Sequence, residues 1–496
     1  MSGRSGESRG PIDWLWTSKA GEPARTKGRS LPAAATLGVL GGLTLACLLV
    51  GSGPSTAAVA FAGAWVVVGA FLSAEIGVGL IILAVALFQR EELFSISLPL
   101  WGGGLKPTDL LLLATLSGWA LRQLLRREGV VRLPRHAAAL VVAFVCWAVA
   151  CAVIGIVRGY GYKASLLELR PLLQYALFLP IASEFEAVCV RRLVSIIKTA
   201  AFVVGAWAIV LCLAGKGSFT TYAGDVRRIA TVNFVVLLVA FLLAAVALAG
   251  NRRGRIASAV VGTVSLVALA VTFQRAAFVG LGLALAVALW LLPRGERSRF
   301  FGIAAVLVFA AAATLSVVGA RAAAGGDTLA AVGSRLASVL DFREDDSAQH
   351  RAAEWSAASA MIAAHPIVGN GLGAKVEFYS PMYDPERQRR GYWSDDIYVH
   401  NSYVWLLTKT GIIGLLLFAI MMGIGLAKAT AEVDRASSSA TRHQMIGLIG
   451  GWIALLAVSA FGPMVTTDDT VPFMVFILGA PFVHAAQGEG RDGREP

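Results

Sequence analysis

Charged residues are scarce in this chain, and their scarcity excludes most soluble folds. Lys, Arg, Asp and Glu account for 15% of the 496 residues, 57% are apolar, and the mean hydropathy is +0.70. A soluble domain has about 25% charged and about 45–50% apolar residues. An intrinsically disordered chain and a large soluble enzyme are therefore excluded, and the composition predicts a polytopic membrane protein.

Cysteine is also rare, and its placement excludes a disulfide scaffold. The chain has five cysteines, none in CxxC or CxxH spacing, and each lies in or beside an apolar run: Cys47, Cys146, Cys151, Cys189 and Cys212. We interpret them as packing residues. The net charge is +12, but the basic residues lie mostly between apolar runs, so no nucleic-acid partner is expected.

Long apolar runs are abundant and predict an all-α integral membrane protein, a polytopic helical bundle of about 14 (12–14) transmembrane helices. The runs lie near 31–50, 56–73, 75–89, 105–121, 137–157, 171–183, 193–214, 230–248, 256–273, 276–293, 301–318, 403–426, 445–461 and 470–484. The third, fourth and sixth are shorter than the roughly 20 residues of a straight span, so we expect them to be tilted, broken or miscounted.

The distribution of Lys and Arg orients the bundle. With the N-terminus inside, the inner connections carry 24 basic residues and the short outer connections carry nine. The positive-inside rule then predicts a disordered cytoplasmic tail over 1–30, about 11 spans over 31–318, C-terminal transmembrane helices over 403–486 and a cytoplasmic tail over 487–496. The 84 residues 319–402 become one large extracytoplasmic loop with short helices, and a connection of this length is usually functional.

This loop contains two motifs that bear on function. Residues 350–364 predict an amphipathic helix that ends at His365-Pro366, before a turn with glycine at 369, 371 and 373. These glycines follow a helix and have no βαβ unit around them, which argues against a nucleotide-binding loop. The loop closes on the segment DDIYVHNS, residues 395–402, directly before an apolar helix over 403–426, so His400 is expected at the outer membrane surface.

These motifs resemble the O-antigen ligase and polymerase superfamily of bacterial membrane glycosyltransferases. The resemblance is specific over Arg351–Phe418 and rests on the string Arg351…Trp355…His365-Pro366…Gly369-x-Gly371-x-Gly373…His400-Asn401…Gly411-x-x-Gly414-Leu415. It implies an enzyme of surface polysaccharide assembly in the inner (cytoplasmic) membrane, which transfers a glycan from a polyprenyl (undecaprenyl) diphosphate to an acceptor hydroxyl on the outer side. It also implies His400 as the catalytic base and Arg275, with Arg170, as ligands of the diphosphate.

The chemistry of the residues is consistent with these roles. A diphosphate leaving group needs charge stabilisation, which guanidinium groups supply through bidentate hydrogen bonds. The acceptor hydroxyl must lose a proton, and imidazole titrates near neutrality. We therefore predict His400 as the catalytic residue, Arg275, Arg170 and Arg228 as diphosphate-binding residues, and Asp396 and Asn401 as supporting residues, without metal or cofactor and with inversion of the anomeric carbon.

Each of these assignments has a structural alternative. His400 is alternatively a helix cap, Arg275 a snorkelling side chain, Arg170 the partner of an acid, and Arg228 a solvated residue of its loop. His350 is interpreted as a solvated residue at a helix start. A metal held by Asp395, Asp396 and His400 is the less economical hypothesis, because Asp396 is better placed to orient the imidazole.

The partners and competing functions follow from the same residues. We expect a lipid-linked glycan donor, a glycan, lipid or protein acceptor, and membrane lipids as partners. The sequence leaves ligase and polymerase open, since both use the same donor. A lipid-linked oligosaccharide flippase is the alternative from another class, although we find no paired halves of the kind that transporters show.

Overall fold

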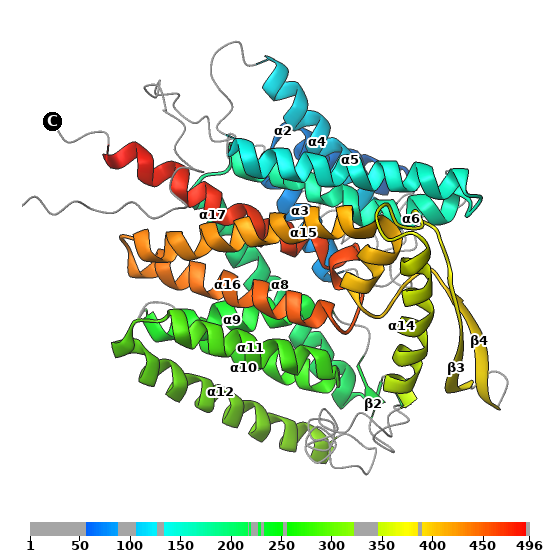
Figure 1. Ribbon diagram of the computed structural model, residues 1–496. Helices are drawn as coiled ribbons and strands as arrows, with labels where there is room; N and C mark the ends of the chain where they lie inside the picture. Colours follow the sequence, from blue (N-terminus) through cyan, green and yellow to red (C-terminus); the bar gives the residue numbers. More distant parts are fainter. Residues whose placement is uncertain are drawn as a thin grey trace, which may run out of the picture.

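The computed structural model describes residues 56–87, 106–125, 133–216, 218–219, 227–229, 233–250, 255–321, 346–384 and 389–492. Within these residues the chain is a bundle of helices with two antiparallel strand pairs (Figure 1). The helices are α2 (Thr56–Leu72), α3 (Ala74–Leu87), α4 (Pro107–Leu125), α5 (Arg135–Val157), α6 (Tyr162–Leu173), η2 (Gln174–Leu177), α7 (Phe178–Glu184), α8 (Ala187–Leu213), α9 (Phe234–Gly250), α10 (Arg255–Val271), α11 (Arg275–Leu291), α12 (Arg294–Arg321), α14 (Asp346–Ala364), α15 (Ser402–Arg435), α16 (Ser439–Ser459), η3 (Met464–Thr466) and α17 (Val471–Asp492). The strands are β1 (Ser218–Phe219), β2 (Arg227–Arg228), β3 (Val376–Asp384) and β4 (Arg389–Asp396).

Helix α9 lies at the centre of one side of the bundle. It packs against α8, α10, α11, α12 and α16, and nearly all of its side chains are buried. This agrees with its sequence, which is apolar on every face, because a helix of that kind needs neighbours all round. In Figure 1, α15 and α16 run through the middle, with α4–α6 on one side and α9–α12 on the other.

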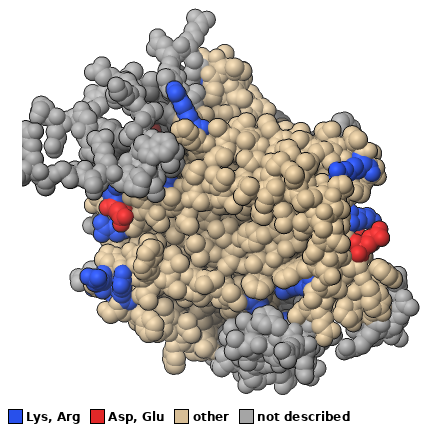
Figure 2. Space-filling view, viewed as in Figure 1, with Lys and Arg blue, Asp and Glu red and all other residues tan. Residues whose placement is uncertain are grey.

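The helices have the composition of membrane spans. Four of those described are long and apolar enough to cross a membrane, namely Arg135–Val157, Ala187–Leu213, Arg294–Thr314 and Ser402–Arg435, and further apolar helices are shorter. In Figure 2 the charged side chains gather toward the two ends of the helices and leave a broad uncharged band between them. The helical membrane-protein class is thus confirmed, whereas the count of about 14 spans stays a prediction, and its first span and the tail 1–30 lie outside the described residues.

The sixth predicted span is broken in the structure. Residues 171–183 divide among the end of α6, the 3-10 helix η2 and the seven-residue α7. Pro171 lies inside α6 and Pro180 inside α7, and each lacks the N–H that a continuous helix needs. Near the C-terminus, α17 continues to Asp492, so part of the predicted tail 487–496 is helical.

Helix α14 and the β3–β4 hairpin lie together at one end of the bundle, which we call the α14 end (Figure 1). Along β3, Val376, Phe378 and Ser380 are buried, while the residues between them are exposed. This alternation is the period of a strand with one covered face, and α14 packs against β3. Among its described residues, the loop predicted to hold short helices contains a 19-residue helix and a hairpin that we did not predict.

The glycine turn after α14 enters a break in α15. Gly411 interrupts the helix with φ +64° and ψ −170°, and the N–H of Ile412 donates to Pro366 O over 2.9 Å. The N–H groups of Asn370 and Gly371 donate to the carbonyls of Thr408 and Lys409. The turn predicted from the glycine spacing thus exists, and it replaces the helical hydrogen bonds that α15 loses at its break.

Gly411→Ala is expected to destabilise the protein by about 1–3 kcal/mol, because its backbone region is essentially restricted to glycine. A Cβ there would also lie 2.1 Å from Ile367 O. The matched control is Gly423→Ala in the same helix, where a Cβ meets nothing within 4 Å. Thermal unfolding of the purified protein in detergent checks this, and equal midpoints for the two variants would contradict it.

Candidate functional site

Glu354 holds His400 through two contacts. The backbone N–H of His400 donates to Glu354 Oε2 over 2.9 Å, and the ring Nδ1 lies 3.0 Å from Glu354 Oε1. The Glu354 side chain is fully buried, whereas 40% of the His400 side chain is exposed. Because a carboxylate only accepts hydrogen bonds, this pairing assigns the ring proton to Nδ1 and leaves the lone pair on Nε2. His400 thus has the tautomer and the exposure of a proton acceptor.

His350 lies beside His400. It is one helical turn before Glu354 on α14, and its ring centroid is 5.6 Å from that of His400. Its Nδ1 is 2.8 Å from Ser380 Oγ, and its ring contacts Phe378 edge to face. Burial lowers the pKa of His350, which favours the neutral ring. The interpretation of His350 as a solvated residue is wrong, because β3 covers this turn of α14.

The two predicted supporting residues have separate roles. Asn401 caps α15, since its side-chain oxygen accepts the N–H groups of Tyr403 and Val404. The capping role considered for His400 is therefore taken by its neighbour. Asp396 closes a turn by accepting the N–H of Tyr398, and the carboxylate on the His400 ring belongs to Glu354 instead. The sequence could not reveal this, because the contact joins positions 46 residues apart.

A buried ion pair fixes the start of α15 beside the site. Lys409 Nζ lies 2.8 Å from Glu168 Oε1 on α6, and both side chains are fully buried. The same carboxylate accepts the indole N–H of Trp405 and the N–H of Gly373, and Lys409 also donates to Ala374 O. Breaking a buried pair leaves an uncompensated charge, which costs several kcal/mol. The pair therefore ties α6, α15 and the glycine turn into one support for His400.

Arg170 pairs with acidic side chains, which is the structural alternative considered for it in the sequence. Its Nε lies 3.3 Å from Asp109 Oδ2 and its Nη1 lies 3.8 Å from Asp468 Oδ2, which also pairs with Lys106 over 3.2 Å. We call these four residues the Arg170 cluster. Burial raises the pKa of Tyr398 to about 12, and charges of this cluster also act on its hydroxyl. Since Tyr398 is two residues before His400, it links the cluster to the site.

Arg275 is the first residue of α11, at the turn from α10. Phe273 in that turn has φ +54°, and Arg275 itself is half-buried. Helix α16 packs against both α11 and α15, so the helix that begins at Arg275 and the helix that follows His400 share a neighbour. Arg228 belongs to β2, where it pairs with Ser218, and its side chain lies outside the described part of the chain.

Asp395 and Asp396, which were considered as metal ligands, each make a different contact. Asp395 is exposed and pairs with Lys375 across the hairpin, and this hydrogen-bonded pairing lowers the pKa of Asp395 and raises that of Lys375. Asp396 closes the turn over Tyr398. Among the described residues, the group with the geometry for a metal is instead His350, Glu354 and His400, whose ligand atoms lie within 4.8 Å of one another.

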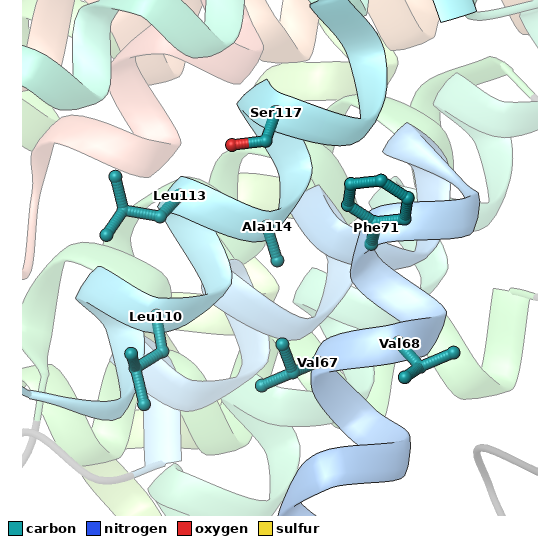
Figure 3. A pocket seen from close by; sticks show the side chains of 7 residues that line it. All are labelled: Val67, Val68, Phe71, Leu110, Leu113, Ala114 and Ser117. Carbon is teal, nitrogen blue, oxygen red and sulfur yellow. The ribbon is translucent and has the colours of Figure 1, made fainter. Parts of the chain in front are cut away.

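An apolar groove lies between α2 and α4 (Figure 3). It is lined by Val67, Val68, Phe71, Leu110, Leu113, Ala114 and Ser117. With only one polar side chain it has no chemistry of its own. Leu110 of this groove directly follows Asp109 of the Arg170 cluster along α4.

Comparison with known proteins supports the reading of these motifs. Residues 259–419 match the family model described as O-antigen ligase. The match runs from α10 into α15 and includes Arg275, Glu354, the glycine turn and His400. No curated protein matches the chain. The match confirms the resemblance to the O-antigen ligase superfamily and supports a membrane glycosyltransferase-like role in polysaccharide assembly.

Proposed function

We propose, with the O-antigen ligase match as the premise, that this chain transfers a glycan from a polyprenyl diphosphate, such as undecaprenyl diphosphate, to an acceptor hydroxyl on the outer side of the cytoplasmic membrane. The reaction is a metal-independent single displacement that inverts the anomeric carbon. The acceptor is a lipid, a protein or another glycan, and these correspond to a ligase or a polymerase. The observation that carries the proposal is the Glu354–His400 pair within the matched region.

His400 acts as the general base in this proposal. The acceptor hydroxyl attacks the anomeric carbon as Nε2 of His400 removes its proton. Glu354 keeps the opposite ring nitrogen protonated and stabilises the imidazolium that forms, because a buried negative charge lies 3.0 Å away. Helix α14 therefore supplies a positioning residue, and the bend before α15 supplies the base.

The cations receive the leaving diphosphate. We assign this role first to Arg275, because it lies within the region that matches the O-antigen ligase model, whereas Arg170 lies outside that region. Arg170 contributes if the diphosphate displaces one of the two carboxylates that it engages, and Arg228 adds positive charge in the connection before α9. The apolar groove between α2 and α4 matches the chemistry of the polyprenyl chain, since its lining is almost entirely hydrocarbon.

The proposal places the α14 end outside the cytoplasm and both termini inside. An alkaline phosphatase fused near Tyr383 is then expected to be active, because it folds only after export. A fluorescent protein fused after Pro496 is expected to be bright. An inactive phosphatase together with a dark fluorescent fusion would reverse the orientation and place the site on the wrong side for this donor.

Arg275→Ala is expected to raise KM for the lipid-linked donor and to lower kcat, because a diphosphate ligand acts in both ground and transition states. Arg275→Lys should restore only part of the affinity, since Lys cannot make a bidentate contact. The control is Arg192→Ala, which removes a surface arginine that is paired with Glu75. Donor titrations on purified protein check this, and an unchanged donor KM in both Arg275 variants would remove Arg275 from the site.

A further inference from the structure

We propose that His350, Glu354 and His400 form an inhibitory binding site for a divalent transition-metal ion of the zinc type. Their ligand atoms lie within 4.8 Å of one another, and Glu354 Oε1 is already 3.0 Å from His400 Nδ1. Ligand atoms on one tetrahedral zinc lie about 3.4 Å apart, as follows from metal–ligand lengths of about 2.0–2.1 Å. Side-chain shifts of about 1 Å therefore bring the three groups onto one ion.

The fold presents these ligands as metal sites usually do. His350 and Glu354 are four residues apart on α14, so both project from one face of the helix. His400 approaches from the bend before α15 and completes two imidazoles and one carboxylate, a set that leaves a fourth position for water. Ser380 Oγ lies 2.8 Å from Nδ1 of His350 and can orient that ring, as the partners of metal-bound histidines do.

The consequence for activity rests on the proposed function. An ion bound to Nε2 of His400 occupies the lone pair that would take the proton. An ion bound to Nδ1 displaces Glu354 and leaves the ring proton on Nε2. In either case Nε2 can no longer accept a proton. Bound metal and proton transfer thus exclude each other. Imidazole ligands favour zinc, copper and nickel over magnesium and calcium, so inhibition should follow that order of ligand preference.

The test begins with direct binding to the full chain in detergent after treatment with a chelator. Titration with Zn²⁺ is expected to show one ion per chain, and bound Co²⁺ is expected to give the visible absorption of a low-coordinate nitrogen and oxygen site. His350→Ala should weaken Zn²⁺ binding at least about 10-fold, and Ser380→Ala should weaken it about 10-fold. The control His365→Ala removes an exposed histidine where α14 ends and should leave binding unchanged.

Inhibition is then measured as the Zn²⁺ concentration that halves each variant's own metal-free activity. That concentration should rise in His350→Ala and Ser380→Ala in proportion to the loss of affinity. Absence of stoichiometric binding, or binding that the His350 variant retains, would overturn the metal site and leave the glycosyltransferase proposal intact. Activity that requires Zn²⁺ would overturn both the inhibitory role and the metal-independent mechanism.

Discussion

His400→Ala is expected to slow glycan transfer by about 10²–10⁴-fold, the usual contribution of a positioned general base. The affinity for the lipid-linked donor should stay nearly unchanged, because the diphosphate is held by arginines. The variant also leaves Glu354 with the backbone N–H of His400 as a remaining partner. Single-turnover transfer with radiolabelled donor measures the rate, and a donor-binding assay measures the affinity.

Two further variants separate catalysis from folding. His400→Gln has a side-chain amide that can donate to Glu354 but cannot accept the proton, so it should be as slow as His400→Ala. His365→Ala removes a different histidine from the same end of the bundle and should transfer at the normal rate. A correctly inserted His400→Gln protein with near wild-type transfer would refute the role of His400 as the base.

Glu354→Gln is expected to lower the transfer rate about 10²-fold, within the range seen for residues that orient a catalytic or metal-bound histidine. The amide keeps the size of the side chain but loses the charge that stabilises the imidazolium. The loss should fall on kcat and leave the donor KM nearly unchanged, because Glu354 acts on the proton transfer through His400 and not on the diphosphate. Glu354→Asp should recover part of the rate, since it restores the charge at a longer distance.

Glu377→Gln is the matched control for this change, because Glu377 is an exposed acid on β3. A purely structural role of Glu354 predicts lower stability without a selective loss of kcat. Thermal unfolding, kcat and the donor KM are therefore measured on the same preparations. An unchanged kcat in a folded Glu354→Gln protein would show that Glu354 does not act through His400.

Local features of the site were predictable from the sequence. The helix over 350–364, the turn at Gly369, Gly371 and Gly373 and the position of His400 before a long apolar helix all depend on neighbours along the chain. The alternation that forms β3 was also visible at Val376, Phe378 and Ser380. It was missed because nine residues of mixed character inside a long loop give a weak signal.

The contacts that organise the site were not predictable in this way. Glu354 meets His400 only because α14 packs beside the start of α15, and Arg170 meets Asp468 across 298 positions of the sequence. The sequence favoured Asp396 because it is close to His400 along the chain. Separation along the chain does not predict which side chains are in contact once a helix packs across a turn. The acid that pairs with His400 could therefore be identified only from the structure.

The central claim is that a new glycosidic bond forms as polyprenyl diphosphate is released. The most direct measurement reconstitutes the purified chain in liposomes with a radiolabelled polyprenyl-diphosphate glycan and an extract of the lipids and glycans of its own cell. The proposal predicts release of polyprenyl diphosphate together with transfer of the label to a product of inverted anomeric configuration, and loss of both in His400→Gln. Movement of intact donor across the bilayer, without any new glycosidic bond, would contradict it and identify a flippase.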